Sequence, residues 1–476
     1  MKYRYTLLFL LSVLVASVSA QTLDQARAMF LRGEYGPAKP VFERFLKTAP
    51  NNANYNYWYG VCCMKTGESE KSIKHLELAH KRKVQNAPYF LGQAYDDCYR
   101  FEEAMTVYEE YISAQTKKKQ DTTQAEALLE KSKLAARMLK GVEEVCVIDS
   151  FVVEKHAFLK AYKISEESGK LYMYDEYFKD WKGHGGTVYE TELGNKVYYG
   201  HKQENDTLDI YAKNKMLNEW GTERELPGSI NSHANTNYPF VMTDGITIYY
   251  ASDGATSIGG YDIFVTRYNS AADTYLLPES VGMPFNSPAN DYMFVIDEFN
   301  QLGWFATDRN QPADTVCVYV FVPNTTKQTY NYEAMEPEKI RSLARLNSIR
   351  DTWKDETVVT EAKQRLQAVM NLKPRTEKKK DFVFVINDNT TYYTLAEFKS
   401  TKAKELFRKY QQKEKDYAQQ VKKLEEMRAQ FAAATQVQKD KLAPAILDLE
   451  RRVEQMYEEL TILAIHTRNE EYNNLK

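Results

Sequence analysis

Hydrophobic and polar residues follow three different patterns along the chain, and each pattern predicts a different kind of structure. Over residues 21–142, apolar residues recur every three or four positions, which is typical of amphipathic helices. Over residues 143–334 the period changes to two, and short β-branched and aromatic runs are separated by turn residues. Helical spacing returns at 335–380, a strand pair is predicted at 381–394, and heptad-patterned helices are predicted at 395–476. The chain is therefore predicted to be a multidomain α+β protein with strands in the middle.

The clearest strand pattern lies at residues 237–267. Three strands are predicted there, at 238–242, 246–251 and 261–266, and glycine-containing turns separate them. Similar strands recur at a spacing of about fifty residues, which is the period of a four-stranded propeller blade. One such sheet cannot bury both of its faces, so the copies are expected to stack around an axis. The recurring segments are 197–201 and 302–309 for the second strand, 208–212 and 316–320 for the third, and a faint copy at 170–175.

Residues 23–111 contain three similar helical units. Gly33 and Gly67 occupy the same place in the first two units, 34 residues apart, and small and aromatic residues recur around them. Pro50 and Pro88 stand where one unit gives way to the next. These units resemble the tetratricopeptide repeat. The resemblance implies an α-solenoid whose concave groove takes a peptide or a helix, and a purely structural role against the strands is the alternative.

The strand repeats carry a second resemblance. Residues 241–267 contain Asp244-Gly245, Ser252-Asp253 and Gly259-Gly260-Tyr261-Asp262 in the order of a TolB-type, WD-repeat-like β-propeller repeat, which the segment resembles. A propeller preceded by helical repeats is similar to a group of Gram-negative cell-envelope proteins, some of them associated with type IX secretion. Those relatives often end in a peptidoglycan-binding OmpA-like domain, whereas this chain ends in a predicted coiled coil. The resemblance covers residues 23–322.

Residues 1–20 have the features of a secretory signal peptide. Lys2 and Arg4 precede an apolar run at 7–15, and small residues predict cleavage before Gln21. An uncleaved membrane anchor is the alternative, but the apolar run is short for a span. The sequence therefore predicts export to the periplasm or cell envelope, without a transmembrane segment after cleavage and with outer-membrane association left open.

The balance of charged residues limits the kinds of partner that the sequence predicts. Among 476 residues, 63 are basic and 66 acidic, so the net charge is −3 and no nucleic-acid partner is predicted. Other envelope proteins or peptides are the predicted partners. The cysteines are odd in number and match no disulfide or metal framework, so buried thiols are favoured over a bridge from Cys62 or Cys63 to Cys98.

A search for chemistry finds no catalytic motif. The sequence contains no G-x-S-x-G, P-loop, H-E-x-x-H, EF-hand or dinucleotide fingerprint, so no enzyme, cofactor or metal is predicted. Asp209 and Asp262 recur before an apolar strand, where they could form a ring of carboxylates around a channel that holds a cation. A turn cap that accepts hydrogen bonds from loop amides is the favoured interpretation. The residues of the propeller-repeat motif are Asp209, Asp253, Gly259, Gly260, Asp262 and Asp308.

Two classes of function stay open. The first is a non-enzymatic envelope scaffold that docks partners through the helical groove and the propeller face. The second is a glycan- or ligand-binding propeller, for which a deep channel lined by aromatic and acidic residues would be the sign. The residues predicted to contact partners are Tyr57, Tyr89, Tyr95, Trp181, Trp220 and Trp304.

The C-terminal third carries two further predictions. The strand pair at 381–394 is expected to join the last blade beside residues 318–322. Residues 395–476 are expected to form an antiparallel helical hairpin with Pro444 in the first turn of its second helix, and one long helix that pairs with another subunit is the alternative. Homo-oligomerisation through this coiled coil is also left open.

Overall fold

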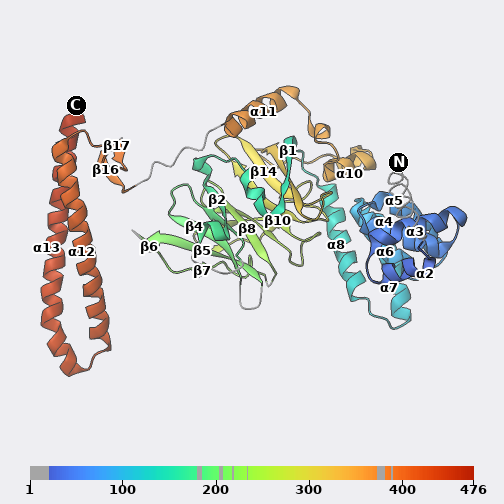
Figure 1. The fold of residues 1–476 in the computed structure, drawn as a ribbon, viewed down its shortest axis with the longest axis horizontal. Coiled ribbons are helices and arrows are strands. Elements are labelled where there is room, and N and C mark those ends of the chain that lie inside the picture. The colour runs from blue at the N-terminus through green and yellow to red at the C-terminus, as the bar shows by residue number, and fades with distance from the viewer. Residues whose placement is uncertain are drawn as a thin grey trace, which may run out of the picture. The chain divides into compact units, whose positions relative to one another are not determined.

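The computed structural model describes residues 21–179, 185–202, 207–216, 219–232, 234–371, 381–387 and 390–475. The chain divides into two compact units, Met1–Asn371 and Leu372–Lys476. As predicted, the fold mixes α and β structure, with helices toward both ends of the chain and antiparallel sheets between them (Figure 1). The predicted signal peptide lies outside the described residues. None of the helices described has the length and apolarity that crossing a membrane requires.

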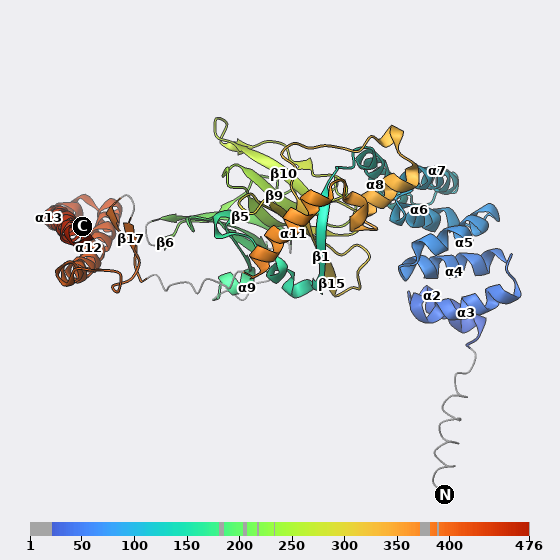
Figure 2. The same ribbon diagram turned by 90° about the horizontal axis from the view of Figure 1, so that it is seen from above.

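The first unit begins with three helical hairpins that stack in sequence (Figure 2), here called the helical array. Gly33 and Gly67 lie in the turns of the first two hairpins with φ of +80° for both, and Tyr99 takes the equivalent place in the third with φ of +58°. Glycine adopts this left-handed conformation without steric cost, which explains the recurring glycines. The hairpins are α2 (Leu23–Leu31) with α3 (Tyr35–Thr48), α4 (Ala53–Lys65) with α5 (Ser69–Lys81), and α6 (Ala87–Asp97) with α7 (Phe101–Lys117).

Helix α8 (Thr123–Lys140) follows the array and lies between it and the sheets (Figure 1). An apolar cluster joins α8 to the turn after α6, to the loop before the strand at residue 262, and to helix α10 (Pro337–Arg345). The cluster includes Phe101 of α7, Leu139 of α8, Ile258 of the loop and Ile340 of α10, all buried. The array and the sheets are therefore packed together within one unit.

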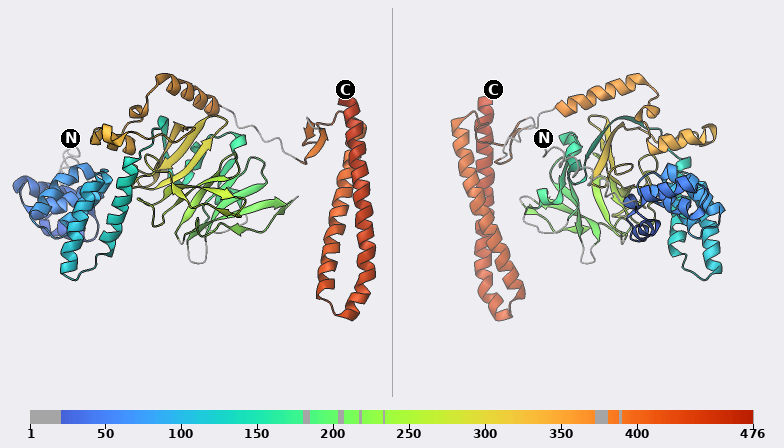
Figure 3. Two further views of the ribbon diagram at one scale, coloured as in Figure 1. Left: turned by 180° about the vertical axis from the view of Figure 1, so that it is seen from behind. Right: turned by 45° about the vertical axis from the view of Figure 1, so that its right-hand side comes forward.

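The middle of the chain forms three antiparallel sheets, here called the sheet body (Figure 3). Within the described residues, no strand pairing joins the three sheets into a closed barrel. The first sheet contains β2 (Lys170–Met173), β3 (Thr187–Glu190), β4 (Lys196–Lys202), β5 (Leu208–Met216), β6 (Glu219–Trp220) and β7 (Arg224–Glu225); a short helix, α9 (Tyr174–Tyr177), follows β2. The second contains β8 (Thr236–Val241), β9 (Thr247–Ser252), β10 (Asp262–Asn269), β11 (Thr274–Tyr275) and β12 (Glu279–Ser280). The third contains β13 (Asp291–Asp297), β14 (Leu302–Thr307), β15 (Thr315–Val322) and β1 (Cys146–Glu154).

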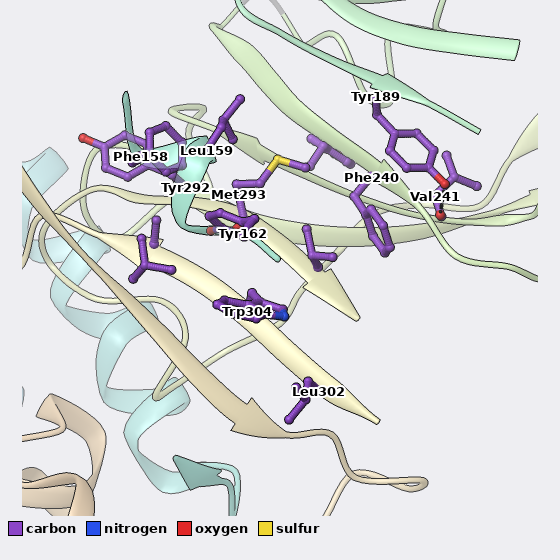
Figure 4. Packing of buried hydrophobic residues seen from close by; sticks show 14 of the residues in the cluster. Phe158, Leu159, Tyr162, Tyr189, Phe240, Val241, Tyr292, Met293, Leu302 and Trp304 are labelled. Carbon is purple, nitrogen blue, oxygen red and sulfur yellow. Dashed lines mark hydrogen bonds between the residues drawn. The ribbon is translucent and has the colours of Figure 1, made fainter. Parts of the chain in front are cut away.

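A single apolar core spans all three sheets. It includes Tyr189 of β3, Phe240 of β8 and Trp304 of β14, together with side chains of helix α11 (Glu356–Asn371) (Figure 4). The short helix at Lys155–Ala161 contributes Phe158, and Tyr162 follows it; Tyr162 donates a hydrogen bond to the carbonyl of Met293 at 2.6 Å. The centre of the sheet body is thus filled with packed side chains, which is the usual source of most of a domain's stability.

The outer edge of β15 corrects one prediction. Strand β1 pairs with β15 along its length, from Cys146 opposite Val322 to Glu154 opposite Thr315. Strands β16 (Phe384–Asn387) and β17 (Thr390–Tyr392) pair with each other instead, so the prediction that they complete the last sheet is wrong. The edge is taken by a strand that precedes the repeats in the sequence, which the spacing of the repeats could not reveal.

The second unit consists of that strand pair and two long helices, α12 (Thr401–Ala433) and α13 (Gln436–Leu475). The helices pack against each other as the predicted hairpin rather than as one long helix. Pro444 lies inside α13 and not in its first turn, because the helix begins eight residues earlier, at Gln436. All five cysteines are free, so the alternative bridge from Cys62 or Cys63 to Cys98 is not formed. Burial raises the pKa of the Cys62 and Cys98 thiols to about 12.

Candidate functional site at the end of the helical array

A hollow of about 240 Å³ lies where the inner helices of the array meet α8 and the sheet body. Its lining combines apolar and polar side chains and includes Ile258 and Pro288 from two loops of the sheet body. The residues that the helices contribute are Met64, Lys65, Gln93, Asp96, Asp97, Phe101, Leu128, Lys131, Ser132 and Ala135. The spacing of Gln93, Asp96 and Asp97 places them on one face of α6.

A wider cleft of about 600 Å³ lies beside this hollow and shares Met64, Asp97 and Pro288 with it. The turn between α4 and α5 forms one wall, including Glu68 and Glu70. Loops of the sheet body and Arg345 of α10 form the other wall, and Arg345 approaches Glu70 at 3.8 Å. Together the two spaces form a continuous groove, named here the array groove.

The array groove contains two carboxylates, Asp96 and Asp97, that accept hydrogen bonds from hydroxyl groups. Asp96 accepts hydrogen bonds from Tyr108 Oη at 2.9 Å and Ser132 Oγ at 2.7 Å, and burial raises the pKa of its carboxyl to about 7. Asp97 accepts a hydrogen bond from Ser69 Oγ at 2.6 Å, and burial raises its pKa as well. Removal of a carboxylate from water disfavours its charged form, so a further donor would stabilise the charged form of Asp96. Asp97 is more exposed than Asp96 and has Lys65 and Arg345 nearby.

Two lysines frame the same groove. Lys131 donates to the carbonyl of Gly259 at 2.7 Å and so ties α8 to the sheet body. Lys65 donates to Gln93 at 3.1 Å and stands over the ring of Phe90 at 5.9 Å. The groove therefore offers donors, acceptors and apolar surface side by side, which suits the backbone and side chains of a peptide.

Tyr99 departs from the repeat pattern at the boundary of the groove. Its φ of +58° is a conformation that the two preceding hairpins give to glycine, yet its side chain is only 4% exposed. The ring packs against Phe101, and Arg345 stands 5.9 Å above it. Backbone strain of this kind persists only where surrounding contacts stabilise it. The buried ring of Tyr99 supplies such contacts and fills the junction between the array and the sheet body, which a glycine could not do.

The structure separates the predicted contact residues into two groups. Trp304 is fully buried in the core of the sheet body, so its prediction as a contact residue is wrong. Tyr57 and Tyr95 are also buried, and Tyr95 donates to Glu77 at 2.7 Å, so both shape the array from inside. Tyr89 is half-buried against Tyr111, and Trp220 is half-buried beneath Lys215, so these two keep a surface for contact. Trp181 lies outside the described residues.

The residues of the propeller-repeat motif have structural partners. Buried Asp262 accepts hydrogen bonds from the amides of Ile258 at 3.1 Å and Gly259 at 3.2 Å, which is the favoured turn cap. Side chains larger than hydrogen at Gly259 or Gly260 would clash with Ala289 or Asn290. Asp209 is buried at the equivalent place in the first sheet. No three His, Cys, Asp or Glu side chains of the described residues are grouped so that they could hold a metal ion.

Asp253 and Asp308 join successive segments by the same contact. Asp253 accepts from the amide and side chain of Asn235, both at 2.8 Å. Asp308 accepts from the amide and side chain of Asn290, at 2.8 and 2.9 Å. Both carboxylates therefore bind an asparagine that lies 18 residues earlier in the chain.

Sequence reasoning missed two further asparagines that hold the sheets together. Asn231 pairs with both the amide and the carbonyl of Ile210, at 2.9 and 3.0 Å. Asn286 does the same with Ile263, at 2.7 and 2.9 Å. A signal was present: Asn-Ser-x-Ala-Asn occurs at 231–235 and again at 286–290. The groove residues of α6 and α8 carried no comparable signal.

The sequence matches no protein-family model, and no curated protein matches it significantly.

Proposed function

We propose that this protein is a non-enzymatic interaction scaffold of the cell envelope, exported by its signal peptide, with tetratricopeptide-like hairpins and a propeller-like sheet body. The array groove is its principal docking site, and the partner is an envelope protein that inserts an extended or helical segment. The observation that carries this proposal is the groove itself, whose lining combines apolar side chains with hydrogen-bond donors and acceptors.

The contrast with the sheet body supports the same choice. Its centre is filled by Phe158, Tyr162 and Trp304, with exposed fractions of 3%, 7% and 0%. An enzyme or a channel-type ligand site would need an accessible central cavity with convergent polar groups. The filled centre of the sheet body therefore favours docking at the array groove over a ligand site in a central channel.

Site-specific photo-crosslinking in cells tests the proposal. A photoreactive amino acid at Gln93, which lines the groove, is expected to capture a protein partner. The same group at Glu109, exposed on α7 and absent from the groove lining, is the matched control. Lys65→Glu introduces a like charge beside the carboxylates and is expected to reduce capture at position 93 at least tenfold.

Equal capture at positions 93 and 109, or capture at 93 that Lys65→Glu leaves unchanged, would contradict a groove-based function. Export is checked separately by the mass of the mature chain, which is expected to begin at Gln21.

A further inference from the structure

A second cavity lies far from the array groove in the sequence, between the first and second sheets of the sheet body. It has a volume of about 340 Å³, at the small end of the range of about 300–1,000 Å³ typical of small-molecule sites. Strands β4, β5 and β7 supply one wall, and β10 and β11 supply the other. The cavity does not include any residue of the array groove.

Tyrosines are the main apolar surface of this cavity. Tyr268 and Tyr275 are half-buried and meet edge to face, with ring centroids 5.3 Å apart. Tyr198 is buried opposite them, with Lys196 Nζ 4.7 Å from its ring centroid. Half-buried tyrosine rings can accept the apolar face of a ligand while their hydroxyls bind water or polar groups.

The charged lining residues balance one another. Lys196 and Arg224 are basic, Glu225 and Asp273 are acidic, and Arg224 reaches from one wall toward Asp273 on the other at 3.9 Å. Asp273 also accepts a hydrogen bond from Tyr268 Oη. An anionic or cationic ligand would meet no net opposite charge here, whereas a neutral ligand with many hydroxyl groups would meet alternating donors and acceptors.

We infer that this cavity, named here the tyrosine pocket, binds a neutral saccharide of two or three rings. One sugar ring stacks on Tyr275. The hydroxyl groups of that sugar form hydrogen bonds with the side chains of Arg224 and Asp273 and with the side-chain amide of Asn214. The inference does not rest on the proposed scaffold function, because the two sites share no residue.

Titration with neutral trisaccharides tests the inference. Maltotriose, cellotriose, mannotriose and the trimer of N-acetylglucosamine are added to the chain that begins at Gln21, and binding is followed by ligand-observed NMR and calorimetry. At least one is expected to bind at millimolar concentration or below. Tyr275→Ala is expected to weaken that binding at least tenfold, and Tyr275→Phe, which keeps the ring, by less than threefold.

Two further variants keep the test decisive if Tyr275→Ala does not fold. Thr274→Trp adds bulk at an exposed lining position and is expected to abolish binding without disturbing the core. Tyr457→Ala removes a tyrosine that is 61% exposed in the hairpin and is expected to leave binding unchanged. The inference is overturned if none of the four sugars binds, if Thr274→Trp leaves binding intact, or if a proline-rich peptide or an acidic sugar competes more tightly than every neutral one.

Discussion

The sheet body and the C-terminal hairpin each contain an arginine–carboxylate pair, and the pairs differ mainly in burial. Arg309 and Asp291 lie 2.7 Å apart with side chains 5% and 0% exposed. Arg428 and Glu450 lie 2.6 Å apart with side chains 57% and 34% exposed. Similar distances therefore describe two different physical situations, because water competes for the second pair and is excluded from the first.

The surroundings of the two pairs follow the same contrast. Arg309 also donates to the carbonyls of Pro284 and Phe285, at 2.7 and 2.6 Å, so the charge that is removed from water is fully hydrogen-bonded. Every residue of β14 is buried, whereas α12 buries only Ala403, Phe407 and Leu424 among its described side chains. The sheet body is thus specified by dense packing and satisfied buried polar groups, and the hairpin by a narrow seam.

The largest effect is expected from removing the buried arginine. Arg309→Ala leaves the buried carboxylate of Asp291 with hydrogen bonds from Ser287 but without its cationic partner, and removes a donor from the carbonyls of Pro284 and Phe285. The free energy of unfolding is therefore expected to fall by about 3–5 kcal/mol. Urea unfolding followed by tryptophan fluorescence measures this change, because all five tryptophans precede residue 354 and report on the first unit.

Far-ultraviolet circular dichroism provides the internal control for this variant. The helical signal of the hairpin is expected to persist after the tryptophan signal is lost, since the two units are compact separately. If Arg309→Ala lowers the free energy of unfolding by less than about 1 kcal/mol, burial does not determine how much an ion pair contributes to stability.

The second largest effect is expected at the end of the hairpin, where the buried carboxylate of Glu471 holds neighbouring segments by hydrogen bonds. Glu471 is fully buried and accepts from the amides of Lys399 at 2.7 Å and Ser400 at 3.0 Å, and from Tyr392 Oη at 2.9 Å. Glu471→Ala leaves these donors unpaired beside the first turn of α12, so a loss of about 1–3 kcal/mol is expected. Hydrogen exchange at residues 399–407 measures it.

Glu470→Ala is the matched control, because the neighbouring carboxylate forms only an ion pair with exposed Lys402 at 3.0 Å. If hydrogen exchange at residues 399–407 speeds up equally in both variants, the hydrogen bonds of Glu471 do not specifically stabilise this end of the hairpin.

The same contrast explains what the sequence could predict. Strand periodicity at 237–267 and glycine spacing in the array report local geometry, so the three sheets, the helical units and the hairpin were predictable. The partner of β15 was not, because pairing with β1 joins Val318 to Phe151 across a separation that no local pattern encodes. The burial of Trp304 was missed for a related reason, because its place in the repeat identifies its strand but does not reveal that both faces of that strand are buried.

The candidate site was harder to predict than the fold. The array groove depends on Ile258 and Pro288 meeting α6 and α8, a contact between separate parts of the chain. Tyr99 could not be predicted as a turn residue, because it stands where the other two hairpins have the glycine that identified them. The glycine repeat therefore predicts the hairpins, whereas Tyr99, which departs from the repeat, lies where the array meets the sheet body.

A third prediction tests whether the sheet body contains a buried carboxyl group that titrates near neutral pH. Burial, together with the nearby charge of Asp291, raises the pKa of Asp262 to about 8, above the ordinary value of 3.8. The folded state therefore binds more protons than the unfolded state between these values, so stability is lost as the pH rises through that range. The slope is expected to reach about 1 kcal/mol per pH unit.

Comparison with Asp262→Asn isolates this contribution, because the amide does not titrate. The variant loses one of the two acceptor bonds to the loop amides and is expected to be less stable at pH 5. Its deficit is expected to shrink as the pH is raised to 8 in parallel urea titrations. A deficit that stays constant across this range would mean that Asp262 remains charged throughout.

The smallest effect is expected from the exposed pair, and it completes the comparison with Arg309. Arg428→Ala removes the same side chain from a contact of the same length, but water hydrates the remaining Glu450, so the loss is expected to be about 0.2–1 kcal/mol. Thermal unfolding of the hairpin followed at 222 nm measures it, and 0.5 M salt is expected to reduce the difference between wild type and variant because the pair is screened. A loss as large as that of Arg309→Ala would mean that Arg428 supports the seam through its aliphatic stem rather than its charge. Arg428→Met, which keeps the stem, would then restore most of the stability, and the distinction between the two regions would lie in packing rather than in the burial of charge.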